Sequence, residues 1–216
     1  MMEFKSIHNV MGIYSRPNIS WQHNIDNLLY NVNKGNGAAW KYLNIDRKLK
    51  SETLKYFRIG LSDEGYISIP VFKDSEHIDN KYRSIPPEPK IFKRCPGAET
   101  WAFHEQGLIE SEKIGYLLVV EGEVDAMSLW QLGFKSVISI ASGAQGPTPW
   151  VTKIPEGIKI YLNFDNDTPG QEAAQDLAER IGLEKCYNVV FKDCKDANEF
   201  LVKGGTKEQF QEILDA

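Results

Sequence analysis

The second half of the chain carries three clusters of acidic side chains, and each cluster follows a run of apolar residues. The acids are Glu121, Glu123 and Asp125 in the first cluster, Asp165 and Asp167 in the second, and Asp196 in the third. Carboxylates that lie close together repel one another when ionised, and a divalent cation removes that repulsion. Mg²⁺ typically binds one or two carboxylates together with the oxygens of substrate phosphates. The clusters therefore predict metal-dependent chemistry on phosphate groups.

The apolar runs before the clusters have the composition of parallel strands that are buried on both faces. The expected strands span Tyr116–Val120, Ser136–Ile140, Ile158–Phe164 and Tyr187–Phe191, and the expected helices span 124–132, 169–181, 197–201 and 207–214. This alternation predicts an α/β domain with a parallel sheet flanked by helices. Residues just past the carboxyl ends of parallel strands meet at one edge, so we expect the three clusters to converge there.

Spacing within the clusters indicates which acids share a cation. Asp165 and Asp167 stand two residues apart behind a strand, so both carboxylates leave from the same face if the strand continues. Glu121 ends another strand, and Asp125 lies on the first turn of the next helix, within reach of the same cation. Glu123 has the alternative role of a charge at a helix N-terminus. For an Asp-x-Asp pair taken alone, a helix cap or an Asx turn is the alternative interpretation.

The first half of the chain is more basic than the second. Residues 1–113 carry a net charge of +2 and residues 114–216 carry −7, of a total of −5. Residues 81–94 contain five basic side chains, one acidic side chain and two aromatic rings. The basic residues are Lys81, Arg83, Lys90, Lys93 and Arg94. Such cations suit phosphates and such rings suit bases, which predicts contacts with a single-stranded nucleic acid or a nucleoside triphosphate. A solvated edge hairpin, protected from aggregation by its charges, is the alternative.

Changes of pattern along the chain indicate three parts. We expect a leader over 1–36, a smaller α+β subdomain over 37–113 and the α/β domain over 114–216. Within the subdomain, Pro70 in the expected strand 66–72 favours an edge position, because proline donates no hydrogen bond to a sheet.

Composition narrows the class of protein. No apolar run approaches the roughly 18 residues that a membrane-spanning helix needs, and Met1–Val10 lacks the pattern of a secretion signal. The three cysteines are odd in number and show no Cys-x-x-Cys spacing, which argues against a disulfide framework and against a zinc site in this chain. We therefore expect a cytoplasmic protein with no membrane partner.

Four segments, in this order and at these distances, resemble the Toprim domain shared by primases and topoisomerases. They are VVEGEVDAMSLWQLGF, the loop with Ser142, Gly143 and Ala144, NFDNDTPGQEAA, and KDANEFL. This version is most similar to the primase domain of phage primase-helicases and Twinkle-like proteins. The basic first half resembles the N-terminal subdomain of DNA primase catalytic cores. The resemblance covers about residues 37–203 and implies a Toprim domain preceded by a smaller α+β primase subdomain.

The resemblance also implies roles for single residues. Glu121 matches the glutamate that Toprim domains place near metal as a general acid or base, and Asp165 and Asp167 match the metal-binding pair. Asp125 and Asp196 match further acids around the metal site. The basic residues that would contact nucleotide and template are Lys81, Arg83, Lys90 and Lys93.

A protein with these parts is expected to be a DNA primase of a bacterial or phage-infected cell. With two Mg²⁺ or Mn²⁺ ions it would join ribonucleoside triphosphates into short RNA primers on single-stranded DNA, beside a replicative helicase in the primosome. The chain shows neither a cysteine-rich zinc module nor the phosphate loop of a helicase, so we expect both elsewhere in a longer polypeptide or on a partner. Two alternatives stay open: a Toprim nuclease, and a non-catalytic single-strand-binding or assembly module of a replicative helicase.

Overall fold

The computed structural model describes residues 20–33, 37–140 and 148–216. The loop with Ser142, Gly143 and Ala144 lies outside the described residues, as does much of the expected leader. The chain divides into two compact units. The first comprises Met1–Ile45 and Leu54–Glu99, and the second comprises Asp46–Thr53 and Thr100–Ala216.

This division differs from the boundary that we expected after residue 113. Helix α5 (Gln106–Ile114) belongs to the second unit, because it packs on strands of that unit's sheet. The approach is close: a Cβ added at Gly107 would lie 2.2 Å from the carbonyl oxygen of Val137. Helix α2 (Ser20–Asn33), which falls in the expected leader, packs instead on the first unit's sheet, where buried Asn24 donates to Ser68 Oγ at 2.8 Å.

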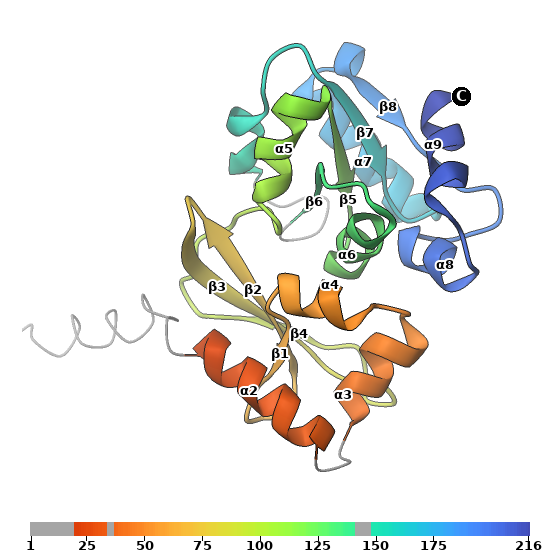
Figure 1. Ribbon diagram of the computed structural model, residues 1–216. Coiled ribbons are helices and arrows are strands. Elements are labelled where there is room, and N and C mark those ends of the chain that lie inside the picture. The colour runs from red at the N-terminus through yellow and green to blue at the C-terminus, as the bar shows by residue number, and fades with distance from the viewer. Residues whose placement is uncertain (1–19, 34–36, 141–147) are drawn as a thin grey trace, which may run out of the picture. The chain divides into compact units, whose positions relative to one another are not determined.

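The first unit contains a four-stranded antiparallel sheet in the order β1-β2-β3-β4 (Figure 1). The strands are β1 (Gly60–Leu61), β2 (Ile67–Lys73), β3 (Glu76–Arg83) and β4 (Phe92–Arg94). The helical elements before β1 in the sequence are α2, the single turn α3 (Ala38–Trp40), a π-helical turn at Lys41–Asp46, and α4 (Ser51–Tyr56). Asp46 and the first three residues of α4 belong to the second unit. The first unit is the smaller α+β subdomain that the sequence predicted.

The expectation of an edge position for the strand with Pro70 was wrong, because β2 lies between β1 and β3. Pro70 itself nevertheless has no strand on one side, as its missing N–H requires. Strand β1 pairs only with Ile67 and Ser68, so at Pro70 strand β2 has a partner on one side alone, where Pro70 faces Asn80. Proline is tolerated there because no second strand requires its missing N–H.

The second unit is built on a four-stranded parallel sheet in the order β6-β5-β7-β8. The strands are β5 (Tyr116–Val120), β6 (Val137–Ser139), β7 (Lys159–Asn163) and β8 (Cys186–Asn188). The α-helices that follow α5 are α6 (Glu123–Leu132), α7 (Thr168–Ile181), α8 (Ala197–Val202) and α9 (Lys207–Asp215), with 3₁₀ turns at Pro149–Lys153 and Leu183–Lys185. The structure confirms the predicted parallel α/β architecture.

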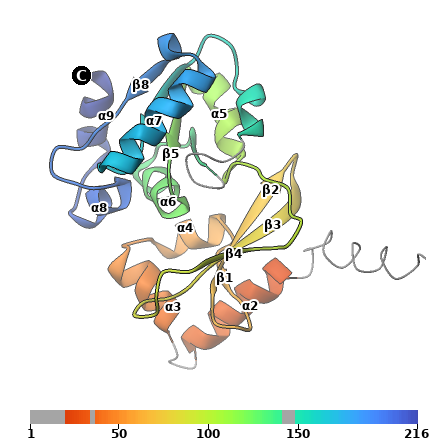
Figure 2. The same cartoon turned by 180° about the vertical axis from the view of Figure 1, so that it is seen from behind.

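The strand order reverses between β5 and β7, and the carboxyl ends of these two strands are where a parallel sheet of this kind binds a ligand. Strand β5 leads through α6 to β6 on one side, whereas β7 leads through α7 to β8 on the other. Helices α5 and α6 lie on one face of the sheet and α7 lies on the opposite face (Figures 1 and 2). The carboxyl ends of β5 and β7 are level, since Val120 pairs with Asn163. Open α/β sheets bind ligands in the crevice at such a switch point.

The core of the second unit explains why these strands read as continuous apolar runs. Leu117, Leu118, Val119 and Val120 of β5 are fully buried, because helices cover both faces of the sheet. Strand β8 ends at Asn188, three residues before the expected end at Phe191. The Val189 N–H still donates a hydrogen bond to the Leu162 carbonyl of β7. No helix among the described residues is both long and apolar enough to cross a membrane.

Candidate metal centre

Glu121 directly follows β5 and is half-buried at the switch point. Its Oε2 is buried and has no hydrogen-bonding partner among the described residues. Burial raises the pKa of Glu121 above its usual value, and the negative charges of Asp165 and Asp167 raise it further. A hydrogen bond from the Asp165 backbone opposes that rise. Glu121 therefore lies within electrostatic range of the acids behind β7.

Asp125 stands on the first turn of α6, and its side chain is buried. Burial, followed by the charge of Asp196, raises the pKa of Asp125 to about 8. Its Oδ1 accepts a hydrogen bond of 3.0 Å from the backbone N–H of Asn198. Gly122 leaves room for the carboxylate, since a Cβ there would lie 2.7 Å from Asp125 Oδ2. Burial and the charge of Asp196 therefore favour the protonated form of Asp125, against the opposing effects of the Asn198 hydrogen bond and the charge of Arg47.

Asp165 and Asp167 occupy the loop between β7 and α7, and Asn166 between them fixes that loop. The Asn166 backbone N–H donates to the Lys195 carbonyl at 2.7 Å, and its side-chain amide donates to the Phe191 carbonyl at 3.0 Å. Asp167 is also the N-cap of α7, because its Oδ1 accepts from the Gly170 N–H at 3.0 Å. This hydrogen bond is the main reason that the pKa of Asp167 is lowered. The capping interpretation of the Asp-x-Asp pair is therefore correct for one oxygen of Asp167.

Asp196 likewise caps a helix, since its Oδ1 accepts from the Glu199 N–H at 2.7 Å at the start of α8. The neighbouring Lys195 extends over the acids behind β7. Its Nζ lies 2.8 Å from Asp165 Oδ2 and 3.5 Å from Asp167 Oδ2. The hydrogen bond to Asp165 is the largest cause of a raised pKa for Lys195, which therefore stays protonated.

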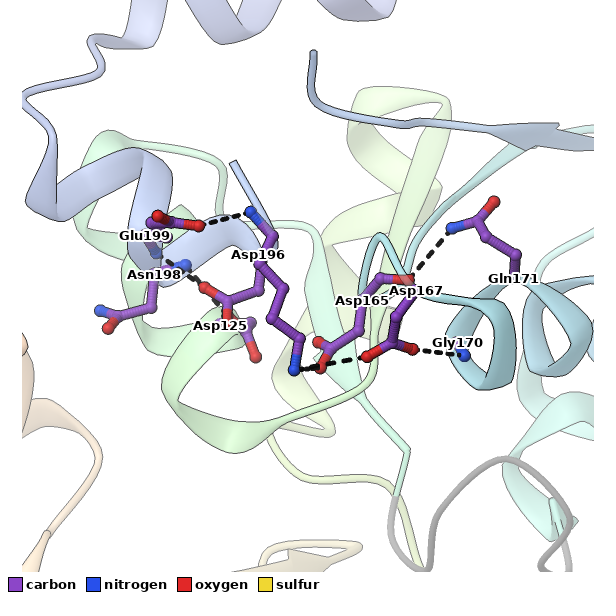
Figure 3. Close-up of polar contacts among 9 residues, drawn as sticks. Asp125, Asp165, Asp167, Gly170, Gln171, Asp196, Asn198 and Glu199 are labelled. Carbon is purple, nitrogen blue, oxygen red and sulfur yellow. Dashed lines mark hydrogen bonds and ion pairs between the residues drawn. The ribbon is translucent and has the colours of Figure 1, made fainter. Parts of the chain in front are cut away.

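Figure 3 shows Asp125 and Asp196 on one side of this group and Asp165 and Asp167 on the other, at the edge of the sheet. The charges of Asp196 and Asp165 both act on Asp125, which ties the two sides together electrostatically. Within the described ranges, no three Asp, Glu, His or Cys side chains are arranged as a ready-made metal site. A cation would therefore bind with adjustment of these side chains.

Two observations show that the residues suit a divalent cation. The Lys195 ammonium already bridges Asp165 and Asp167 as a monovalent stand-in. Glu121 Oε2 is a buried acceptor that finds no donor among the described residues, and such acceptors call for a missing ligand. Carboxylate oxygens are the ligands that Mg²⁺ and Mn²⁺ prefer.

The four predicted nucleotide and template contacts all belong to the first unit, but they do not share one face of its sheet. Lys93 pairs in register with Tyr82, whereas Lys81 and Arg83 pair with Arg94 and Phe92, so Lys93 lies on the opposite face from Lys81 and Arg83. Lys81 and Arg83 are on β3, Lys93 is on β4, and Lys90 precedes β4. Three of these cations lie over aromatic rings: Arg83 is 4.9 Å from the Tyr42 ring centre, Lys93 is 4.0 Å from that of Tyr66, and Lys90 is 5.2 Å from that of Phe92.

Phe92 itself is 55% exposed. Exposed rings beside cations have the chemistry of a surface that binds single strands.

Sequence reasoning missed three residues that shape the acid group. Lys195 was visible only as a neighbour of Asp196, and Asn198 only as part of the same segment. Arg47, from far away in the sequence, donates from Nη1 to Asn198 Oδ1 at 3.0 Å. A basic residue directly before a predicted metal-binding acid was the available signal for Lys195, whereas Arg47 carried no local signal.

Comparison with known proteins now defines the class. Residues 118–201 match the Toprim-like family model, so the second unit contains a Toprim-like domain. The catalytic domain of a DnaG primase bound to single-stranded DNA shares the fold, with a TM-score of 0.72 and 15% identity. That likeness covers 90% of this chain and 75% of the primase chain. The fold is therefore that of a primase catalytic core with a Toprim domain, as the resemblance implied.

Two curated proteins are similar in sequence to most of this chain. It is 27% identical to the chloroplastic and mitochondrial Twinkle homologue of Arabidopsis thaliana and 28% identical to a primase homologue of the same plant, in each case over 79% of this chain. The chain is thus similar in sequence to a Twinkle homologue and to a primase homologue. The matched regions span 27% of the first relative and 57% of the second.

Proposed function

We propose that the chain is the catalytic core of a DNA primase, which synthesises short RNA primers on single-stranded DNA. The observation that carries the proposal is that Glu121, behind β5, feels the charges of Asp165 and Asp167, behind β7, at the switch point of a Toprim-like domain. The likeness to a primase catalytic domain extends over 90% of the chain, beyond the Toprim-like domain, and therefore supports primer synthesis rather than another reaction of Toprim domains. The protein would act in the cytoplasm of a bacterial or phage-infected cell.

Two Mg²⁺ or Mn²⁺ ions would be held by five acids: Glu121, Asp125, Asp165, Asp167 and Asp196. When bound, such ions lower the pKa of an attacking hydroxyl and stabilise charge on a transferred phosphate. The chain's own residues position this group. The Asn198 and Glu199 backbone N–H groups orient Asp125 and Asp196, and the Gly170 N–H orients Asp167. Glu121, whose pKa is raised by burial, would accept or donate the proton at the primer hydroxyl.

The first unit would supply the contacts to nucleic acid and nucleotide. Lys81, Arg83, Lys90 and Lys93 would neutralise phosphates, and exposed Phe92 would offer a ring to a base. A replicative helicase and a zinc-binding module, on the same polypeptide or on separate partners, would complete the primosome.

The test is a synthesis assay with the full chain, single-stranded templates of varied sequence, Mg²⁺ or Mn²⁺, and labelled ribonucleoside triphosphates. We expect short template-dependent oligomers, and we expect Asp165→Asn to lower the yield at least about a hundredfold. The control is Asp176→Asn, which removes an exposed acid from α7 and should leave the yield unchanged. Metal-dependent cleavage of the template without incorporation would instead indicate a nuclease. Binding without either reaction would indicate a non-catalytic module.

A further inference from the structure

The contact between Lys195 and the two acids behind β7 occupies atoms that a metal ion would need. Asp167 has one oxygen engaged, because Oδ1 accepts from the Gly170 N–H. Oδ2 is the oxygen that stays available to a ligand, and Lys195 Nζ lies 3.5 Å from it. The same ammonium lies 2.8 Å from Asp165 Oδ2. A cation that binds this pair of oxygens must therefore take the place of the ammonium.

The backbone of Lys195 is fixed while its side chain remains accessible. Its carbonyl accepts from the Asn166 N–H at 2.7 Å, and its N–H donates to Glu199 Oε2 at 2.5 Å. These two bonds hold the start of the side chain beside the acids. The side chain is 53% exposed, so water and ions reach the ion pair. Exposed ion pairs of this kind contribute little free energy, which allows a divalent ion to displace the ammonium.

We propose that Lys195 is a resident counter-cation of the Asp165 and Asp167 pair, and that a divalent ion must displace it before the site fills. The inference rests on the metal site of the proposed function. In the metal-free protein the ammonium reduces the repulsion between the two carboxylates. Its presence also raises the metal concentration at which the site becomes occupied, because lysine and metal compete for the same oxygens.

Binding of Mn²⁺ to the substrate-free full chain, followed by electron paramagnetic resonance, tests this competition. Lys195→Met keeps the length of the side chain and removes its charge. We expect this variant to bind Mn²⁺ roughly two- to fivefold more tightly than the wild type, the range expected when an exposed ion pair is removed. Lys192→Met is the matched control, since it removes an exposed cation three residues away with the same change in net charge. Equal affinities of the two variants would overturn the proposal.

A second readout follows Lys195 directly and does not depend on a variant. Partial acylation of the native protein, read by mass spectrometry, reports how accessible each amine is. We expect Mg²⁺ to increase acylation of Lys195, because the displaced ammonium leaves the carboxylates, while acylation of Lys192 stays constant. Unchanged acylation of Lys195 at saturating Mg²⁺ would refute displacement even if Lys195→Met folded poorly. Lys195→Arg, which keeps the charge, should retain weak Mn²⁺ binding.

Two further variants separate this proposal from the proposed function. Asp165→Asn and Asp167→Asn should each lose most of the Mn²⁺ binding. If they do, and Lys195→Met behaves as Lys192→Met, only the role of Lys195 fails. If both asparagine variants bind Mn²⁺ as the wild type does, the metal site lies elsewhere and both proposals fail.

Discussion

At the scale of single residues, two of the candidate ligands serve two purposes. Asp167 and Asp196 each cap a helix through Oδ1, and each retains a second oxygen that takes no part in capping. Capping needs only an acceptor, whereas binding of a divalent cation needs the negative charge as well. The structural and the chemical role of one side chain can therefore be separated by substitution.

Asp167→Asn should keep the cap and lose the metal, whereas Asp167→Ala should lose both. Asparagine caps helices about as well as aspartate, so we expect the free energy of unfolding to stay within about 0.5 kcal/mol for the asparagine variant. It should fall by about 1 kcal/mol for the alanine variant, which leaves the Gly170 N–H without its acceptor. Urea unfolding measures the first effect, and Mn²⁺ binding and primer yield measure the second. Metal-dependent synthesis by the asparagine variant would contradict the ligand assignment.

At the scale of elements, a buried polar network joins α8 to α6 and to the segment Asp46–Thr53. Asn198 is at its centre. The side-chain amide donates to the Arg47 carbonyl and to Ser128 Oγ, both at 2.9 Å, and its Oδ1 accepts from Arg47. The Asn198 backbone N–H meanwhile holds Asp125. A satisfied buried network of this kind specifies one arrangement of the elements that meet in it.

Asn198→Leu should destabilise the fold far more than the same substitution on the surface. The variant keeps roughly the volume of the side chain but removes three hydrogen bonds at a position that is 1% exposed. We expect the free energy of unfolding to fall by about 2–4 kcal/mol. Asn188→Leu on β8 is the control, because this exposed side chain donates a hydrogen bond to Gln171, and its replacement should change stability by less than about 1 kcal/mol. Equal losses in urea unfolding would disprove the importance of the network.

At the scale of the whole molecule, charge is divided between the two halves of the sequence. The basic residues on β3 and β4 are in the first unit, and the acids proposed to bind metal are in the second. Contacts to phosphates release counterions, so binding of single strands by the first unit should weaken as salt rises. Lys93 must also give up its ion pair of 3.3 Å with Glu64 to meet a phosphate.

Replacing Lys90 or Lys93 by glutamine should weaken binding of single-stranded DNA most at low salt. Each lost contact should reduce the slope of log affinity against log salt by about 0.7. Fluorescence anisotropy of a labelled oligothymidine between about 50 and 200 mM salt measures this slope. Lys113→Gln is the charge-matched control, since Lys113 forms an exposed ion pair with Glu110 in the second unit. A slope unchanged in both variants would favour the solvated hairpin edge instead.

The sequence by itself determined the parallel sheet and the position of the acids along it. Strands such as Tyr116–Val120 are buried on both faces and must be apolar throughout. Glu121 directly follows β5, and Asp165 comes two residues after the end of β7. Parallel strands all place those ends at one edge. Local patterns therefore sufficed to predict that Glu121, Asp165 and Asp196 share a region.

Only the tertiary structure decided which groups surround the acids. Asn198 meets Arg47 across 151 positions of sequence, and Lys195 reaches Asp165 because the Asn166 N–H ties two loops together. Strand order likewise made β2 an interior strand in spite of Pro70. Such contacts depend on how whole elements pack, and no local periodicity records them. The position of the Lys195 ammonium beside Asp165 and Asp167 therefore depends on the folded chain, and so does the proposed control of metal binding.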